Sequence, residues 1–199
     1  MGNSKQEPNQ EMEWIRQAQR GDRDAFGRLV ERYQRRIFSL VYHLLHRREV
    51  VEDMAQEIFL KTYLAIGKFN FESSFATWVG RIAVNHCYDY LRRERSSKVK
   101  YFSEMSEEAS QRIEERAQSD DPGGAADVEK QTWIKETVGA LLERASPDDR
   151  TILVLKEMEE FTVEEIAQIM KLTETAVKVR LHRARKRMLE DYARWRKGR

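Results

Sequence analysis

Hydrophobic residues recur at helical spacing along most of the chain, and no stretch alternates between apolar and polar residues as a strand would. A short first helix carries Trp14, Ile15 and Ala18, and it ends near Gly21. Asp22 then caps a longer helix, whose apolar stripe consists of Phe26, Leu29, Val30, Tyr33, Ile37, Leu40, Val41, Leu44 and Leu45. The pattern predicts an all-α protein.

Two further helices complete an N-terminal domain, which we expect at residues 1–96. The third helix runs from about Val50 to Ile66, and the fourth begins at Ser73 or Ser74 and reaches about Arg95. One broad sector of the fourth helix should be buried, and it consists of Phe75, Trp78, Val79, Ile82, Ala83, His86 and Tyr90.

The segment at residues 97–127 is polar and acidic and includes the turn-forming sequence DPGG at 121–124. This composition predicts a flexible linker. Residues 128–199 then predict a second domain of about four helices. Its first helix carries Trp133, Val138, Leu141 and Leu142, and its second begins at a cap, Ser146, followed by Pro147.

The last two helices of this domain carry the most informative pattern. Thr162 and Glu165 have capping-box spacing and start a short helix, and residues 171–173 interrupt the pattern that follows. The next helix turns an apolar stripe inward, which consists of Val177, Leu181, Ala184 and Met188. Its outer side is basic and varied in hydrogen-bonding capacity, as in a helix that reads duplex DNA in the major groove. The alternative is an ordinary amphipathic helix with a solvated positive face.

A second candidate surface for nucleic acid lies on the polar side of the fourth helix, which carries Arg81, Asn85, Tyr88, Arg92 and Arg95. Aromatic, amide and guanidinium groups on one face suit a single strand, whose bases stack on rings while cations follow its backbone. The loop before this helix, residues 69–74 (FNFESS), offers rings and small polar groups that can hold an extruded base. The alternative is a polar helix surface beside an ordinary loop.

The third helix presents a small acidic and polar face formed by Asp53, Gln56, Glu57 and Lys61. Such a face repels DNA, so a protein partner is the better interpretation. The alternative is again a solvated helix face.

The net charge of +2, from 36 basic and 34 acidic residues, conceals segregation along the chain. Acidic residues dominate positions 104–129 and basic residues dominate from Lys178 onward, so the C-terminal end should attract phosphate. No apolar run has the length of a membrane span, and the N-terminus lacks a signal-peptide layout. Cys87 is the single cysteine, which argues against an internal disulfide or a multi-cysteine zinc site. We expect a cytoplasmic protein without a cofactor and without direct membrane insertion.

Three segments, in order, resemble the motifs of bacterial sigma factors. Residues 53–60 (DMAQEIFL) resemble the D-x-x-Q-E-x-F-x helix that binds core RNA polymerase. Residues 75–85 (FATWVGRIAVN) resemble the F-x-T-W-x-x-R-I-A-x-N melting helix, and residues 177–186 (VKVRLHRARK) resemble the V-K-x-R-L-x-R-A-R-K recognition helix. The two-domain form resembles the extracytoplasmic-function (ECF) subgroup of the sigma-70 family.

The resemblance implies a non-catalytic subunit that binds core RNA polymerase and gives it promoter specificity. The implied polymerase-binding residues are Asp53, Gln56, Glu57, Phe59 and Lys61. Those implied for opening and holding the minus-ten element, with one base flipped into the loop, are Asn70, Phe71, Glu72, Ser73, Ser74, Trp78, Arg81, Asn85, Tyr88 and Arg92. Those implied for the duplex minus-thirty-five element are Lys178, Val179, Arg180, His182, Arg183 and Lys186. The partners implied are core RNA polymerase, promoter DNA and, as in many relatives, an anti-sigma protein.

The chain departs from the family pattern at several positions, one of which is the segment Thr175-Ala176-Val177 where the family often has G-T-V. The family often has glycine in the turn where this chain has Lys171, and its frequent R-G-D/E-S loop reads NFES at residues 70–73, with Phe71 in place of glycine. Val179 stands at a position that is often polar, and its side chain suits contact with a thymine methyl group.

Two other functions are considered beside this one. A regulator that binds duplex DNA by itself through its C-terminal helices would leave the melting-helix motif unexplained. An enzyme acting on nucleic acid would need a metal or acid–base site, which Glu52, Asp53 and Glu57, or His43 and His46, could suggest. His86 and Cys87 suggest metal or redox chemistry too, but His86 falls on the buried sector and a lone thiol is more often a packing residue. No accompanying ligand motif supports that reading.

Overall fold

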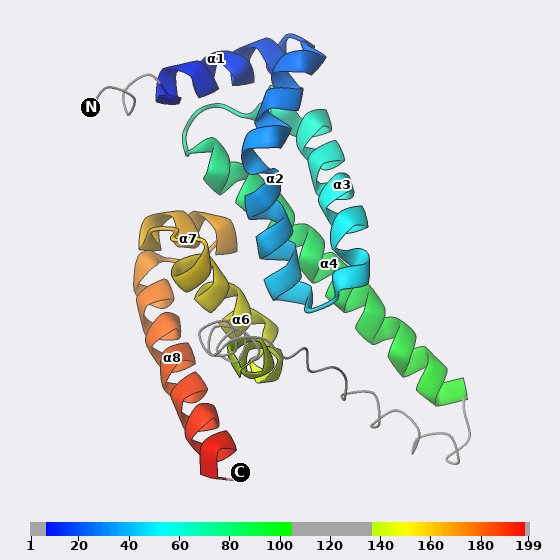
Figure 1. The fold of residues 1–199 in the computed structure, drawn as a ribbon, viewed down its shortest axis with the longest axis vertical. Helices are drawn as coiled ribbons and strands as arrows, with labels where there is room; N and C mark the ends of the chain where they lie inside the picture. The colour runs from blue at the N-terminus through cyan, green and yellow to red at the C-terminus, as the bar shows by residue number, and fades with distance from the viewer. Residues whose placement is uncertain (1–6, 105–136, 198–199) are drawn as a thin grey trace, which may run out of the picture.

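The computed structural model describes residues 7–104 and 137–197, and within them it contains helices and no strand (Figure 1). The all-α prediction is confirmed. The N-terminal part contains α1 (Glu7–Gln19), α2 (Arg23–Leu45), α3 (Arg48–Ala65), the 3-10 turn η1 (Ile66–Lys68) and α4 (Phe75–Glu104). The C-terminal part contains a helix at residues 137–144, α6 (Pro147–Leu153), the π-helical turn η3 (Val154–Met158), α7 (Val163–Met170) and α8 (Glu174–Lys197).

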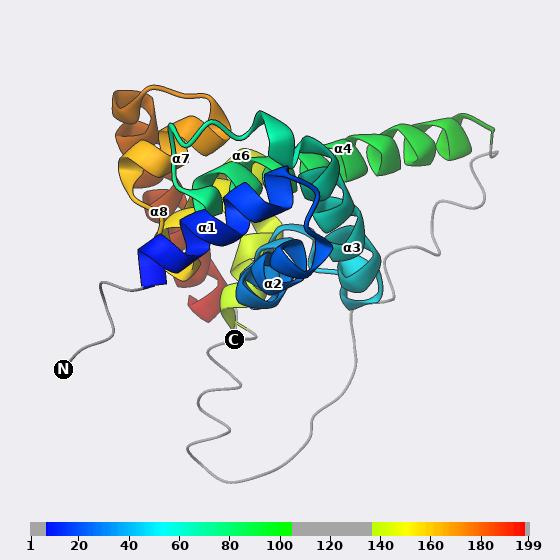
Figure 2. The same ribbon diagram turned by 90° about the horizontal axis from the view of Figure 1, so that it is seen from above.

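The fourth helix is longer than its sequence pattern indicates. It continues past Arg95 to Glu104, into the segment predicted as a linker, and its last turns extend away from the other helices (Figures 1 and 2). The rest of the predicted linker and Trp133 lie outside the described residues.

The predicted helix caps are present. Asp22 Oδ1 accepts hydrogen bonds from the amides of Asp24 at 2.9 Å and Ala25 at 3.0 Å. The Thr162 hydroxyl accepts from the Glu165 amide at 3.2 Å, while the Glu165 carboxylate accepts from the Thr162 amide at 2.9 Å. Each cap satisfies backbone donors that the helix leaves open, and losing one typically costs about 1 kcal/mol.

A tight turn joins α7 to α8. Lys171 has a left-handed backbone with φ of 55°, and the amide of Leu172 donates to the carbonyl of Ala167 at 2.9 Å. The Thr173 hydroxyl then accepts from the amide of Ala176 at 3.2 Å and starts the next helix. The stripe of α8 packs inward as predicted, with Val177, Leu181 and Ala184 buried and Met188 half-buried.

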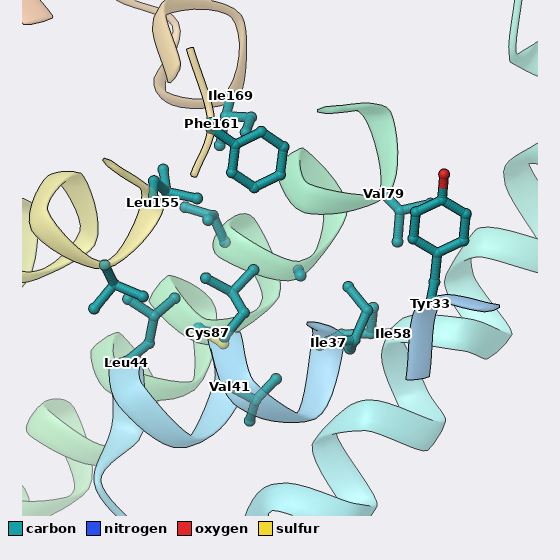
Figure 3. Packing of buried hydrophobic residues seen from close by; sticks show 14 of the residues in the cluster. Tyr33, Ile37, Val41, Leu44, Ile58, Val79, Cys87, Leu155, Phe161 and Ile169 are labelled. Carbon is teal, nitrogen blue, oxygen red and sulfur yellow. The ribbon is translucent and has the colours of Figure 1, made fainter. Parts of the chain in front are cut away.

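One continuous hydrophobic core joins the N-terminal and C-terminal parts (Figure 3). Phe161 and Ile169 project from the region of α7 toward α4, and both are almost fully buried. Burying a side chain of this size stabilises a fold by about 1.5–3 kcal/mol. The two parts are therefore held together by packing as well as by their connecting chain.

This packing changes the expected faces of α4. The sequence assigned Ile82 and Tyr90 to the buried sector, but both are only half-buried. Gly80, Val84 and Cys87 are buried instead. A Cβ atom at Gly80 would lie 3.3 Å from both Ile169 Cδ1 and Phe161 Cζ, which shows that α7 covers a second side of the helix. A one-sided amphipathic pattern does not describe a helix that is covered on two sides.

Candidate nucleic-acid interface

The outer face of α8 is basic and accessible. Lys178, Val179, His182, Arg183 and Lys186 are all exposed there. Lys178 pairs with Glu174 and Lys186 with Glu190, one turn away along the same exposed helix. Such surface pairs contribute at most about 1 kcal/mol, so both ammonium groups remain available to phosphate.

Arg180 differs from the other predicted reading residues. It is half-buried, and its Nη1 donates to Asp148 Oδ2 on α6 at 2.8 Å. In this structure its guanidinium therefore faces the N-terminal turn of α6.

The polar side of α4 is partly covered. Asn85 and Arg92 are exposed and Arg81 is half-buried, whereas the Tyr88 hydroxyl donates to Asp148 Oδ1 and to Thr151 Oγ1, both at 3.1 Å. Burial raises the pKa of Tyr88 to about 12, so its phenol stays protonated near neutral pH.

The loop before α4 combines an exposed rim with an aromatic base. Its rim residues Asn70, Phe71, Glu72 and Ser74 are exposed and Ser73 is half-buried. Trp78, which the sequence assigned to the DNA-contacting set, is 8% exposed and packs against Phe69 and Phe75 with ring centroids 5.3 and 5.7 Å apart. Packing in this cluster is more favourable for the apolar Trp78 ring than contact with water. Trp78 therefore supports the loop from inside the protein.

Glu165 links the start of α4 to α7. Its Oε1 accepts from the hydroxyls of Ser74 at 3.1 Å and Thr77 at 3.0 Å. Burial alone would raise the pKa of Glu165, but the Thr162 amide and these two hydroxyls outweigh burial and lower that pKa. The carboxylate is thus held ionised against the loop that precedes α4.

The predicted face of α3 is exposed and larger than expected. Its polar residues Asp53, Gln56, Glu57 and Lys61 all reach solvent, while Phe59 is half-buried against the core. Leu60 and Leu64 extend this face and are 58% and 73% exposed, which the sequence reasoning missed. These two leucines lie four residues apart, next to polar positions on the same helix face, and this spacing could have predicted that they extend the face.

Buried His86 lies behind this face. Lys61 Nζ is 2.6 Å from His86 Nδ1, and Glu57 Oε2 is 3.0 Å from His86 Nε2. These contacts assign the ring proton to Nε2, because Lys61 has only protons to donate. Burial and the Lys61 charge lower the pKa of His86. The neutral imidazole therefore accepts a hydrogen bond from Lys61 and lies beside the Glu57 carboxylate.

One carboxylate connects the two candidate DNA surfaces. Asp148 accepts both from Tyr88 on α4 and from Arg180 on α8. A second contact lies near α2, where Arg36 Nε is 3.4 Å from Glu159 Oε2 and its guanidinium lies 3.8 Å from the centre of the Phe161 ring. The candidate DNA surfaces of α4 and α8 are therefore connected through Asp148 in this structure.

The residues considered for metal chemistry form no site here. Among the described residues, no group of three histidine, cysteine or acidic side chains is arranged to hold a metal ion. Glu52, Asp53 and Glu57 are exposed on α3. In the same residues, no helix has the combined length and apolarity that crossing a bilayer requires.

Comparison with known proteins identifies the family. The family model described as Sigma-70 region 2 matches residues 29–97, and the one described as Sigma-70, region 4 matches residues 135–188. The RNA polymerase sigma-H factor of Pseudomonas aeruginosa is 34% identical over 187 residues, covering 88% of this chain and 90% of that protein. The chain belongs to the sigma-70 family.

The ECF subgroup expected from the sequence is also confirmed. The ECF RNA polymerase sigma factor SigW of Bacillus subtilis is 30% identical to this sigma factor over 172 residues, covering 86% of this chain and 90% of SigW. A solved structure with the same fold is the sigma factor RpoE in complex with the anti-sigma factor NepR from Bartonella quintana. It has a TM-score of 0.63 and 22% identity, covering 83% of this chain and 94% of that one. The sigma-70 family is not an enzyme family.

Proposed function

We propose that this sigma factor binds core RNA polymerase in the cytoplasm and directs it to specific promoters, without catalytic activity of its own. The observation that carries the proposal is the presence, in one chain, of an exposed basic recognition helix and a polar, aromatic surface at the start of α4. The family membership supplies the polymerase as the partner that performs the chemistry. We divide the roles between residues 1–96 and residues 128–199, joined by the linker at 97–127.

The minus-thirty-five element is read as duplex by the outer face of α8. Lys178 and Lys186 contact phosphates, His182 and Arg183 donate to base edges, and Val179 contacts a thymine methyl group. The exposure of these five side chains supports this assignment. Arg180 joins them only when it leaves Asp148.

The minus-ten element is held as a melted strand by the loop at residues 69–74 and the polar side of α4. Asn85 and Arg92 are exposed there and supply hydrogen bonds and positive charge. Tyr88 becomes a stacking surface once its hydroxyl is released from Asp148. Trp78 contributes by supporting the loop.

Core polymerase binds the exposed face of α3. Asp53, Gln56 and Glu57 supply its polar part, and Leu60 and Leu64 supply its apolar part. Exposure of the two leucines to water is unfavourable in the free protein, and binding to polymerase would bury them. We also propose an anti-sigma protein as a regulatory partner, which the solved complex of a structural relative supports.

Reading both elements requires the two parts to separate. The elements lie about 25 base pairs apart, which at 3.4 Å per base pair is roughly 85 Å of B-form duplex. Tyr88 and Arg180 contact the same carboxylate in this structure. The arrangement described here is thus a closed form, and binding to polymerase opens it.

Capture of purified core polymerase tests this proposal. The full chain should bind core tightly and bind promoter duplex weakly when alone. Asp53→Lys should weaken core capture, while Glu164→Lys, an equal change of charge at an exposed position on α7, should leave it unchanged. Tight duplex binding without polymerase, together with no capture of core, would favour the stand-alone regulator instead.

A further inference from the structure

A buried histidine of α4 reaches the exposed face of α3. The side chain of His86 is 1% exposed, yet both of its ring nitrogens lie next to charged groups of that face. Lys61 Nζ is 2.6 Å from Nδ1, and Glu57 Oε2 is 3.0 Å from Nε2. His86 directly follows residues 75–85, which carry the resemblance to the melting helix, so that motif does not include it.

The positions of Glu57 and Lys61 favour an ion pair between these two residues. They are four residues apart on one helix with the acidic residue first, which is the favourable order for a pair along a helix surface. In the described residues, however, no ion pair joins them. The ammonium group contacts one nitrogen of the ring, and the carboxylate lies beside the other. The imidazole of His86 therefore separates two opposite charges that would otherwise pair.

Packing alone does not explain an imidazole at this position. Burying it costs more than burying a hydrocarbon of similar size, because its nitrogens lose their contact with water. Lys61 satisfies Nδ1, but Nε2 is buried without a hydrogen bond of good geometry in the described part of the chain, although the Glu57 carboxylate is close. A leucine would fill the site without this cost. His86 therefore contributes more than packing, and its two contacts point to the α3 face.

We infer that His86 is a positioning residue, which holds the Lys61 ammonium group away from Glu57 and so presents both charges separately to core polymerase. This inference rests on the proposed function and adds a residue of α4 to the polymerase-binding machinery. The matching surface of the polymerase carries an acidic group opposite Lys61 and a basic group opposite Glu57. Ordering one long side chain before binding strengthens the complex by about two- to tenfold, because its entropy is already lost in the free protein.

Two substitutions of His86 separate positioning from packing. His86→Leu removes the acceptor and leaves Lys61 free to pair with Glu57, so affinity for core should fall by about two- to tenfold. His86→Asn places an amide oxygen near the position of Nδ1, where it can accept from Lys61, and it should bind core more tightly than His86→Leu. A role in packing alone predicts the opposite order, because asparagine leaves more of the buried site empty than leucine.

A double-mutant cycle measures the coupling between His86 and Lys61. Lys61→Met, at an exposed position, should weaken core binding in the wild-type background. In the His86→Leu background its effect should be smaller, because Lys61 is then already paired with Glu57. Asp53→Asn is the matched control. Asp53 lies on the same face and forms no hydrogen bond or ion pair with His86 in the described ranges, so its effect should be equal in both backgrounds.

Nitrogen NMR of the free chain gives a check that needs no substitution of His86. Nδ1 should be the unprotonated ring nitrogen in the wild type, because Lys61 donates to it. Lys61→Met should shift the Nδ1 resonance. A wild-type ring protonated at Nδ1, or a resonance that Lys61→Met leaves unchanged, would remove the contact that the inference requires, whether or not His86→Leu folds.

The affinity of each full-length chain for purified core polymerase, without DNA, decides between the outcomes. Failure of the wild type to bind core contradicts the proposed function. If the wild type binds and folded His86→Leu binds equally well, the positioning role is wrong. Equal effects of Lys61→Met in both backgrounds, or weaker binding by His86→Asn than by His86→Leu, would also overturn it.

Discussion

Gly80 offers a direct way to perturb the closed form. It lies where α4 meets α7, and a Cβ atom there would lie 3.3 Å from Phe161 and from Ile169. Both neighbours are almost completely buried, at 2% and 1% exposure, so they have little room to move. Gly80→Leu should therefore force the two parts of the chain apart.

The size of this effect follows from two contributions. Leucine improves helix propensity by roughly 0.8 kcal/mol relative to glycine, but α4 is a helix in both forms, so this gain cancels from the opening equilibrium. Overpacking a filled core costs about 1–3 kcal/mol, and this cost applies only to the closed form. The open population should therefore rise by about 5- to 150-fold relative to the closed one.

Distance measurement between two probes checks this prediction. Cys87 is the only cysteine and is buried, so cysteines introduced at exposed Gln34 and Leu189 can be labelled selectively. Pulsed electron paramagnetic resonance on the Gly80→Leu chain, without polymerase, should show a broad distribution of longer distances between the two labels. A distance distribution identical to that of the wild type, in a folded variant, would refute the packing argument.

A matched control and a functional readout complete the experiment. Gly27→Leu makes the same change in α2, where a Cβ atom would meet nothing within 4 Å, and it should leave the distances unchanged. Holoenzyme containing Gly80→Leu should retain promoter-specific transcription, because position 80 no longer faces α7 in the open form.

Three further predictions concern DNA reading and pH. Arg183→Ala should cost about 1–3 kcal/mol of discrimination at one upstream base pair, measured by binding of holoenzyme to promoter variants; a uniform loss across all variants would instead indicate a phosphate contact. Asn85→Ala should leave the closed promoter complex intact and reduce strand opening several-fold, measured by footprinting and by permanganate reactivity of unpaired thymines; an equal loss in both assays would contradict its assignment to the melted strand. Burial, Arg150 and His43 lower the pKa of His46 to about 4, so the unfolded chain binds more protons than the folded one between about pH 4 and 6.5. Stability should therefore fall on acidification through this range, by up to about 3 kcal/mol from this group. Denaturant titrations of His46→Asn should show a flatter pH dependence, because asparagine tolerates the left-handed backbone at this position and does not titrate.

The helices and their caps could be predicted because they depend on local sequence. Asp22, Ser146 and Thr162 cap helices as predicted, since a side chain bonding to nearby amides needs no distant partner. The two faces of α8 were predictable for the same reason, because its buried stripe and its basic face both follow from helical periodicity.

Features that depend on contact between distant segments could not be predicted in the same way. The burial of Gly80 reflects α7, which follows about 80 residues later in the chain, and Asp148 acquires its two partners only when both parts pack together. The family pattern nevertheless pointed to two of the strained sites. The resemblance led us to expect glycine at the positions of Phe71 and Lys171, and both adopt the left-handed backbone that glycine favours.

Transcription in vitro tests the central claim most directly. Core polymerase, with and without this sigma factor, is supplied with a library of genomic promoter fragments, and transcript start sites are mapped. The account predicts new start sites that share an upstream duplex element and a downstream melted element at a fixed spacing. The absence of any start site that depends on the added chain, despite active core polymerase, would contradict it.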